Sequence, residues 1–463
     1  MTEQLKLKLN DSKATRWGAL VIVAFTMMAA YYVNDVVAPL KTMLETDLAW
    51  SSTDFGFFTG GYSFLNVFFL MLIWGGLILD RFGIRFTGKL ATILMVGGTA
   101  LEYYAMTGLA GADATLFGIN EIFGYKTGVF VAFAGYSIFG VGAEVAGITV
   151  SKIIAKWFKG KELATAMGVQ VALARIGSQA GYAVAIPLAR AFGISTPVLL
   201  GLVLLLGGMI AFFIFAVMDK KLDKQMDAAA IAAGTEDEEE KFSFKDVKNI
   251  LVNPGFWLIA LLCVLFYSCV FPFQKFASEL MIIKYGINEN VAGTFAGLPA
   301  LGALILTPVF GGFIDKRGKS ASIMLLGSAM LICVHFIYAI PDINYWLVAI
   351  VLMIILGIAF SLVPSAMWPA VAKIFPVSQL GTAYALIFFI QNIGLWGIPT
   401  LIGWVLDAYC ISGKKPDGTN MYDYTVPMCI FTSIACLSLI VALLLKKADK
   451  KYGYKLEEPN IQK

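Results

Sequence analysis

The feature that most constrains this chain is a series of apolar stretches, each about long enough to cross a bilayer. A helix rises about 1.5 Å per residue, so about 20 mostly apolar residues span the hydrocarbon core. Only 14% of the 463 residues are charged, and the mean hydropathy is +0.78. A soluble domain needs more polar surface than this. We therefore expect an all-α integral membrane protein with twelve transmembrane helices, near residues 17–38, 53–79, 87–108, 128–150, 164–190, 194–218, 255–281, 290–314, 320–340, 345–370, 380–405 and 425–445.

One long charged insert divides the apolar stretches into two sets of six. We interpret residues 219–254 as a cytoplasmic linker, between an N-terminal six-helix half at 1–218 and a C-terminal six-helix half at 255–463. The first sixteen residues are polar and lack the apolar core of a secretory signal. We expect them to form a cytoplasmic tail.

Basic residues indicate the orientation, because cytoplasmic loops are enriched in Lys and Arg. With twelve spans, the main basic clusters fall on one side of the membrane, and we expect both termini to be cytoplasmic. The clusters contain Lys6, Lys8, Lys13, Arg16, Arg81, Arg85, Lys89, Lys156, Lys159, Lys161, Lys316, Arg317, Lys319, Lys446, Lys447, Lys450 and Lys451. The opposite loops are poorer in basic residues, with Lys41, Lys126, Arg190, Lys414 and Lys415.

The same short motif follows the second and the eighth apolar stretch. It reads Gly76-Leu-Ile-Leu-Asp80-Arg81-Phe-Gly83 in the first half and Gly311-Gly-Phe-Ile-Asp315-Lys316-Arg-Gly318 in the second. Glycines let helices approach closely, and a carboxylate can sit at a neighbouring helix N-terminus. We expect Asp80, Arg81, Asp315 and Lys316 to act in gating, by holding the cytoplasmic side shut in one conformation. Ordinary turns with positive loops would explain one copy of the motif, but less easily two.

A second repeat relates the fifth stretch to the eleventh at an offset of 217 residues. Leu163-Ala-Thr-Ala matches Leu380-Gly-Thr-Ala, and the segment 174–177 matches 391–394. Arg175 then corresponds to Asn392. The repeats predict two halves related by a pseudo-two-fold axis.

Two six-helix halves that share this loop motif resemble the major facilitator superfamily over the whole chain. Three segments are similar to one branch, the lysosomal dipeptide transporter type (major facilitator superfamily domain-containing protein one) and its bacterial relatives. They are WFKGKELATAMGVQVALARIGS at 157–178, FPF at 271–273 and MWPAVAKIFPVSQLGTAYALIFFIQNIG at 367–394. The lysosomal members carry acidic dileucine sorting signals, which neither tail here shows. We therefore expect the inner membrane of a bacterium rather than a lysosomal membrane.

Glu144 and Arg175 are the most informative charges, since an ionisable group inside a span costs about 2.5–3.5 kcal/mol on insertion scales. Helix rise places both about 18 Å from the cytoplasmic end of their helices. They can neutralise each other, or bind the two ends of a zwitterion. The resemblance implies that Arg175 binds a peptide carboxylate and Glu144 the amino terminus. The alternative is a structural ion pair between the fourth and fifth helices.

Three further charges are candidates for gating or coupling. Asp35 lies about 27 Å above Arg16 by helix rise, nearer the outer mouth, and it either pairs with Lys41 at the helix end or acts in gating. Lys275 follows Pro272, which gives its helix a place to bend, and it either extends outward or lines the outer cavity. Glu102 lies in the middle of the third span and is either neutral and hydrogen-bonded or a proton site.

Polar and aromatic residues complete the predicted substrate site. Gln391 and Asn392 lie at the depth of Arg175 in the second half and can hydrogen-bond a peptide backbone. Trp368, Tyr384 and Tyr136 are candidates for side-chain pockets, and we include Tyr32, near the end of the first helix. Aromatic residues in spans are, however, more often packing or interfacial residues.

These residues predict a secondary carrier that moves dipeptides by alternating access, as a monomer or with an accessory subunit. The alternative is an organic anion carrier that uses Arg175, with Glu144 as a proton relay. A proton is a candidate co-substrate in either case, although the E-x-x-E-R signature of proton-coupled peptide transporters is absent. We expect no enzyme activity, cofactor, metal or nucleic acid partner, because one histidine and scattered cysteines offer no catalytic or metal-ligating cluster.

Overall fold

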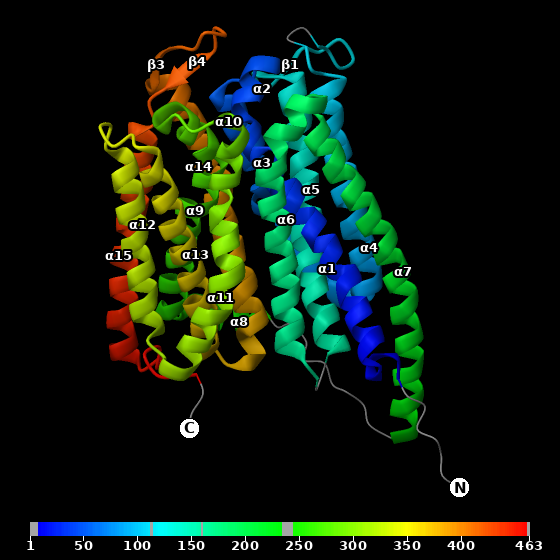
Figure 1. Cartoon of the computed structure of the whole chain (residues 1–463). Helices are drawn as coiled ribbons and strands as arrows, with labels where there is room; N and C mark the ends of the chain where they lie inside the picture. Colours follow the sequence, from blue (N-terminus) through cyan, green and yellow to red (C-terminus); the bar gives the residue numbers. More distant parts are fainter. Residues whose placement is uncertain (1–7, 112–113, 159–160, 234–243, 461–463) are drawn as a thin grey trace.

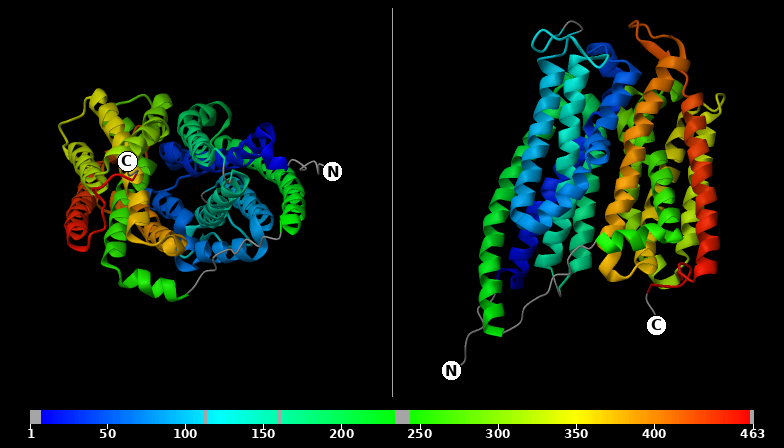
Figure 2. Two further views of the ribbon diagram at one scale, coloured as in Figure 1. Left: turned by 90° about the horizontal axis from the view of Figure 1, so that it is seen from below. Right: turned by 180° about the vertical axis from the view of Figure 1, so that it is seen from behind.

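A computed structural model describes residues 8–111, 114–158, 161–233 and 244–460 of the chain. Three predicted features lie outside these residues. They are part of the tail, with Lys6, then Lys159, and the acidic part of the predicted linker. The long helices form two groups that stand side by side (Figure 1), and the view along their axes separates the same two groups (Figure 2). The helices are η1 (Leu9–Asp11), α1 (Lys13–Val36), η2 (Ala38–Leu40), α2 (Lys41–Asp47), α3 (Ser52–Phe68), α4 (Met71–Thr107), α5 (Thr127–Trp157), α6 (Leu163–Phe192), α7 (Thr196–Ala233), α8 (Phe244–Val252), α9 (Pro254–Tyr285), α10 (Glu289–Ala296), α11 (Leu298–Arg317), α12 (Ser320–Ala339), α13 (Trp346–Ile374), α14 (Val377–Tyr409) and α15 (Thr425–Tyr452).

The two ends of the helix bundle differ in what they carry. One end bears two small antiparallel hairpins, β1–β2 (Glu121–Ile122 and Tyr125–Lys126) and β3–β4 (Ile411–Lys414 and Asn420–Tyr422). We call it the hairpin end. Both ends of the described chain lie at the opposite end, which we call the tail end (Figure 1). This placement agrees with an even number of spans.

The all-helical fold is confirmed, but the count of twelve spans stays a prediction. Within the described residues, nine helices are long and apolar enough to cross a membrane, or ten if the bent pair α3 and α4 is one span. Helix α6 has 30 residues but is not among them, because Arg175, two glutamines and several small residues lower its hydropathy. Helix α4 covers parts of two predicted spans, 53–79 and 87–108. Gly83 lies between these spans and interrupts the helix with φ +74 and ψ 173.

The second predicted span is broken in two. Helix α3 ends at Phe68, and α4 leaves it at an angle of 58°. Leu70 connects the two helices in the left-handed conformation, with φ 54 and ψ 33. A side chain in this conformation costs energy that the surrounding packing must offset. The bend redirects the chain toward the tail end before the motif at Asp80.

The internal repeat has a counterpart in the helix boundaries. Helices α13 and α14 end at Ile374 and Tyr409, each 217 residues after the ends of α5 and α6 at Trp157 and Phe192. The first half departs from regularity at its last helix, since α7 continues to Ala233. The predicted linker at 219–254 therefore begins inside α7, and it contains α8 after the residues that the structure does not describe.

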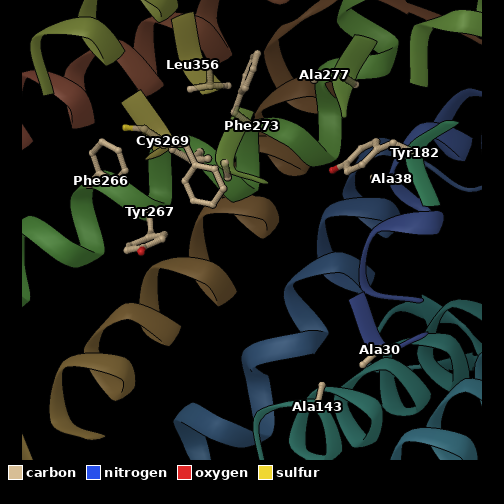
Figure 3. Packing of buried hydrophobic residues seen from close by; sticks show 14 of the residues in the cluster. Ala30, Ala38, Ala143, Tyr182, Phe266, Tyr267, Cys269, Phe273, Ala277 and Leu356 are labelled. Carbon is tan, nitrogen blue, oxygen red and sulfur yellow. The ribbon is translucent and has the colours of Figure 1, made fainter. Parts of the chain in front are cut away.

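Glycines and alanines allow the helices of the first half to pack closely. A Cβ added at Gly98 of α4 would lie 2.4 Å from the Gly135 carbonyl oxygen of α5, and one at Gly140 would lie 2.0 Å from the Tyr62 carbonyl oxygen of α3. Figure 3 shows Ala30 of α1 and Ala143 of α5 where those two helices approach each other. Small residues thus place α5 close against three neighbouring helices.

Neighbouring glycines test this packing. Gly98→Ala should destabilise the protein, because the new methyl group meets the backbone of α5, and overpacking of this kind typically costs about 1–3 kcal/mol. Gly97→Ala is the matched control, since an added Cβ there meets nothing within 4 Å. Thermal unfolding of the purified protein in detergent should show a lower midpoint for Gly98→Ala alone. Equal midpoints for the two variants would contradict the close approach of α4 and α5.

Candidate functional site

Arg175 lies in the middle of α6, twelve residues or about 18 Å from its start at Leu163. Its guanidinium carbon lies 4.8 Å from the ring centre of Phe360 on α13 and 5.6 Å from that of Tyr31 on α1. The side chain is partly buried. No described residue accepts a hydrogen bond from Arg175 or forms an ion pair with it. Its N–H groups are therefore free to bind a ligand.

Glu144 lies at a similar depth on α5, thirteen residues or about 20 Å from the end of this helix at Trp157. It is partly buried, and one carboxylate oxygen accepts a hydrogen bond from the Tyr62 hydroxyl at 3.0 Å. Tyr62 comes from α3 and was missed in the sequence, where nothing relates its position to that of Glu144. The tyrosine orients the carboxylate and leaves capacity for a cationic group.

Glu144 and Arg175 do not form an ion pair within 4.0 Å in the described structure. Helix α1 packs between α5 and α6 and contacts both. The Tyr31 ring of α1 lies 5.6 Å from the Arg175 guanidinium carbon. The alternative, a structural ion pair between the fourth and fifth helices, is thus not observed among the described residues. The two charged groups lie at a similar depth without pairing with each other.

Aromatic side chains of the second half face this site. Phe360 packs edge-on against Phe271 of α9, with ring centres 5.3 Å apart, and lies near Tyr267 on the same helix. Trp368 lies two helical turns farther along α13 and packs against Tyr267 at 6.4 Å. Figure 3 shows Tyr267 and its neighbour Phe266 on α9. Phe360 and Tyr267, which contact or approach Arg175, were not among the predicted residues.

The two predicted amides of the second half are turned into the protein. Gln391 is 8% exposed, and its side-chain oxygen lies 3.5 Å from the Cys263 sulfur. Asn392 is 2% exposed and donates from its side chain to the Phe388 carbonyl oxygen at 2.9 Å. The side-chain oxygen of Asn392 has no partner within the described part of the chain. Neither amide contacts Arg175 in this conformation.

The remaining predicted aromatic residues lie in three different places. The Tyr384 hydroxyl donates to the Trp368 carbonyl oxygen at 3.0 Å, nearer the tail end than Arg175. The Tyr32 hydroxyl donates to the Pro197 carbonyl oxygen at 3.2 Å, so this side chain points toward α7. The Tyr136 hydroxyl donates to the Asn34 carbonyl oxygen at 2.8 Å, nearer the hairpin end. The structure therefore brings only part of the predicted set together.

A second polar cluster lies between the central charges and the hairpin end. Lys275 of α9 forms an ion pair with Asp35 of α1 at 3.2 Å and donates to the Asn34 carbonyl oxygen at 2.6 Å. Asp35 also accepts a hydrogen bond from Ser178 of α6. The expectation that Lys275 extends outward is wrong, because the lysine is 9% exposed and has an acceptor across the interface. Asp35 binds this lysine rather than Lys41.

Glu102 belongs near this cluster rather than in the middle of its span. It lies five residues before the end of α4 at Thr107, about 8 Å from the hairpin end of the helix. The side chain is fully buried, and neither carboxylate oxygen has a partner among the described residues. The Lys275 charge acts on it. The predicted span ended at 108, one residue beyond Thr107, so Glu102 lies in the last third of that span rather than in its middle.

A third cluster of charges closes the hairpin end. Lys41 of α2 lies between Glu45 and Glu279, with an Nζ–Oε2 distance of 2.5 Å to Glu279 on α9. Lys415, after β3, reaches Glu45 at 3.3 Å and Glu279 at 3.5 Å. Tyr424 donates to Glu279 as well. The sequence showed Lys41 as an isolated loop charge and Lys415 only beside Lys414, because the cluster joins segments far apart in the chain, such as Lys41 and Glu279, which are 238 residues apart.

The two loop motifs lie at the tail end, and their described polar contacts are within their own half. Asp80 is exposed and pairs with Lys152 of α5 at 3.2 Å, while Arg81 lies over the Phe82 ring at 5.5 Å. Asp315 accepts a hydrogen bond from the Asn460 side chain at 2.8 Å, and Lys316 is exposed. Within the described ranges, these motif residues form no ion pair or hydrogen bond across the two halves.

The polar contacts between the halves that we describe, all among residues of the described ranges, lie on the hairpin side of the bundle or near its middle. Besides the two charge clusters, the Thr53 backbone N–H donates to Asp407 at 2.6 Å, and Gln179 donates to the Thr294 carbonyl oxygen at 3.3 Å. Arg190 binds Glu289 and Asn290 across the same interface. The described contacts are those of a bundle whose hairpin end is closed.

Comparison with known proteins extends these observations. The chain is 28% identical over 450 residues to the lysosomal dipeptide transporter MFSD1 of Homo sapiens, covering 94% of this chain and 87% of that protein. It is 26% identical over 441 residues to the protein of the same name from Danio rerio, covering 93% of this chain and 86% of that protein.

Solved structures share the fold at low sequence identity. The nucleoside transporter NupG matches with a TM-score of 0.68 and 12% identity, over 92% of this chain and 98% of that one. The peptide transporter POT in complex with sulfate matches with a TM-score of 0.67 and 14% identity, over 95% of each chain. The family and the names of the relatives indicate a membrane carrier rather than an enzyme. Because the family model of the Major Facilitator Superfamily matches residues 20–399, the chain belongs to this superfamily.

Proposed function

We propose that this carrier transports small zwitterionic peptides, in the first place dipeptides, by alternating access. Arg175 binds the peptide carboxylate and Glu144 the peptide amino group. The relatives named as dipeptide transporters support the proposal, since their similarity extends over most of the chain.

One observation carries the proposal: Arg175 is held at mid-depth between two aromatic rings and lacks an acceptor among the described residues. A guanidinium stays ionised in proteins and presents a planar fork that matches a carboxylate with two parallel hydrogen bonds. A purely structural arginine inside a membrane would instead be paired with protein groups. An anionic group of the substrate is the partner that the site lacks.

Glu144 determines which anion fits. A monocarboxylate needs only Arg175, whereas a dipeptide also presents an ammonium group at the other end of two residues. An extended dipeptide backbone spans about 7 Å, so its two termini can reach two charged groups that do not pair directly with each other. A carboxylate that accepts one hydrogen bond from Tyr62 retains acceptor positions for an ammonium. The pair therefore favours a zwitterion over a simple organic anion.

The Lys275–Asp35 pair is the proposed gate nearest to the substrate. It connects α9 of one half to α1 of the other and must separate when the hairpin end opens. Lys41, Glu45, Glu279 and Lys415 form the outer layer of the same closure. Asp80, Arg81, Asp315 and Lys316 are proposed to act at the tail end, in the conformation that closes that end.

Replacement of Arg175 tests carboxylate recognition. Arg175→Ala should abolish uptake of labelled dialanine into proteoliposomes, and Arg175→Lys should transport poorly, because a point charge does not replace the planar fork. Uptake of a C-terminally amidated dipeptide measures what is left without a carboxylate, and it should be low in all three proteins. Normal dialanine uptake by Arg175→Ala would refute the proposed substrate site.

Replacement of Glu144 tests the polarity of binding. Glu144→Gln should weaken the inhibition constant of free dipeptides at least tenfold, since a charged pair is lost, and should change that of N-acetylated dipeptides far less. Competition against a labelled substrate measures both constants, with Glu121→Gln on the exposed β1 strand as a matched control. Equal losses for the two peptide types would contradict the assignment of the amino group to Glu144. Strong inhibition by monocarboxylates in the unmodified protein would favour the organic anion carrier.

Asp35→Asn tests the gate. The change leaves the Lys275 ammonium without its carboxylate, and breaking a buried pair commonly costs about 3–5 kcal/mol, so the population with an open hairpin end should grow. Spin labels at the exposed positions Asp47 and Tyr345, in a cysteine-free background, report the distance between the halves. Asp342→Asn, at another exposed site, is the control. An unchanged distance distribution for Asp35→Asn would exclude Asp35 as a gate residue.

A further inference from the structure

The contact between Arg175 and Phe360 joins the two halves at the depth of the proposed substrate site. Arg175 belongs to α6 of the first half, and Phe360 belongs to α13 of the second. The guanidinium carbon lies 4.8 Å from the Phe360 ring centre, closer than the 5.6 Å to Tyr31 of its own half. A cation within about 6 Å of a ring centre is attracted by the negative face of the ring. The stronger contact is therefore the one across the interface.

Phe360 is fixed in place by its own half. It is 2% exposed. Its ring packs edge-on against Phe271, at 5.3 Å with an interplanar angle of 80°, and against Tyr267, at 6.3 Å with an angle of 87°. Edge-to-face arrangements of this kind are the preferred ones for aromatic pairs. The ring is thus a rigid surface rather than a side chain free to follow the arginine.

The arrangement leaves the N–H groups of the guanidinium accessible to a ligand. Ring faces interact with the cation but accept no strong hydrogen bond. Arg175 consequently keeps its N–H donors free among the described residues, while its charge is stabilised. A carboxylate binds in the plane of the guanidinium through these N–H groups. Ring and carboxylate can therefore hold the same arginine at the same time.

The internal repeat shows that this residue is particular to the second half. The offset of 217 residues relates Phe360 to Ala143 and Ser361 to Glu144. Ala143 is small and lies where α1 approaches α5, as Figure 3 shows. A phenylalanine at the matching place in α13 reaches across the interface instead. The two halves thus contribute differently to one site, the first with charges and the second with a ring.

We propose that Phe360 is a positioning residue for the substrate carboxylate: its ring holds the Arg175 guanidinium in the orientation that receives the carboxylate, and it links carboxylate binding to the approach of the second half. This proposal rests on the proposed function of Arg175. The carrier then selects solutes with a free carboxylate through an arginine that is correctly aligned only when Phe360 lies against it.

The test compares three replacements of Phe360 in proteoliposomes. Phe360→Leu removes the ring, and the KM for dialanine should rise about five- to thirtyfold, the range expected for a desolvated cation–π contact, with a much smaller change in maximal rate. Phe360→Tyr and Phe360→Trp keep a ring and should stay within about threefold of the original KM. Phe256→Leu truncates an equally buried ring at the start of α9 and should lower thermal stability without raising KM.

Amidated peptide and a double variant separate this proposal from the function on which it rests. Phe360→Leu should hardly change the weak inhibition by C-amidated dipeptides, and in an Arg175→Lys background it should raise KM by clearly less than in the original protein. A KM that rises equally for all three Phe360 variants, or equally for free and amidated peptides, would overturn the positioning role while Arg175 remains the carboxylate site. Normal dialanine transport by Arg175→Ala would instead refute the proposed function itself.

Discussion

The arrangement of charges inside an apolar bundle is the constraint on which the rest of this structure depends. A charged side chain removed from water needs a partner, because desolvation costs several kcal/mol per ion. Most fully buried charges of the described residues meet this requirement, as Lys41 does with Glu279 and Lys275 with Asp35. Arg175 and Glu144 are only partly buried, and they are left with two rings and one hydroxyl. Their incomplete partnering distinguishes a binding site from a structural ion pair.

The sequence predicted the architecture well where a physical period or a repeat carries the information. The apolar stretches placed the long helices, and the offset of 217 residues recurs in the ends of α13 and α14. The prediction was weaker at broken helices. The left-handed Leu70 divides one predicted span and could not be located from hydropathy, whereas the non-helical Gly83 lies in the gap between the predicted spans 53–79 and 87–108. The hydropathy of α6 is too low to mark it as a span within the described residues, because that helix carries Arg175, two glutamines and several small residues.

The site could be predicted only in part, for a reason that lies in helix rotation. Depth follows from counting residues, which placed Glu144 and Arg175 at one height. The direction of a side chain around the helix depends on tertiary packing, which a single sequence does not give. Tyr32 was chosen, although its neighbour Tyr31 is the residue beside Arg175, and the side chains of Gln391 and Asn392 turn toward Cys263 and Phe388 of their own half. Phe360 gave no signal, because one aromatic residue in a long apolar helix resembles ordinary packing.

The charge clusters at the hairpin end also explain how a closed carrier can open again. In a buried pair, the attraction between the charges roughly offsets the cost of removing them from water, so the net stabilisation is small. When the hairpin end opens, water replaces the protein partners of Lys275, Asp35, Lys41 and Glu279. The attraction between the charges and the cost of removing them from water are then lost together. An interface closed only by apolar packing would lose its contacts and expose apolar surface without such compensation. Paired charges therefore align the two halves in the closed state, and they keep the free energy of that state near that of the open state. A carrier that visits both states requires this balance.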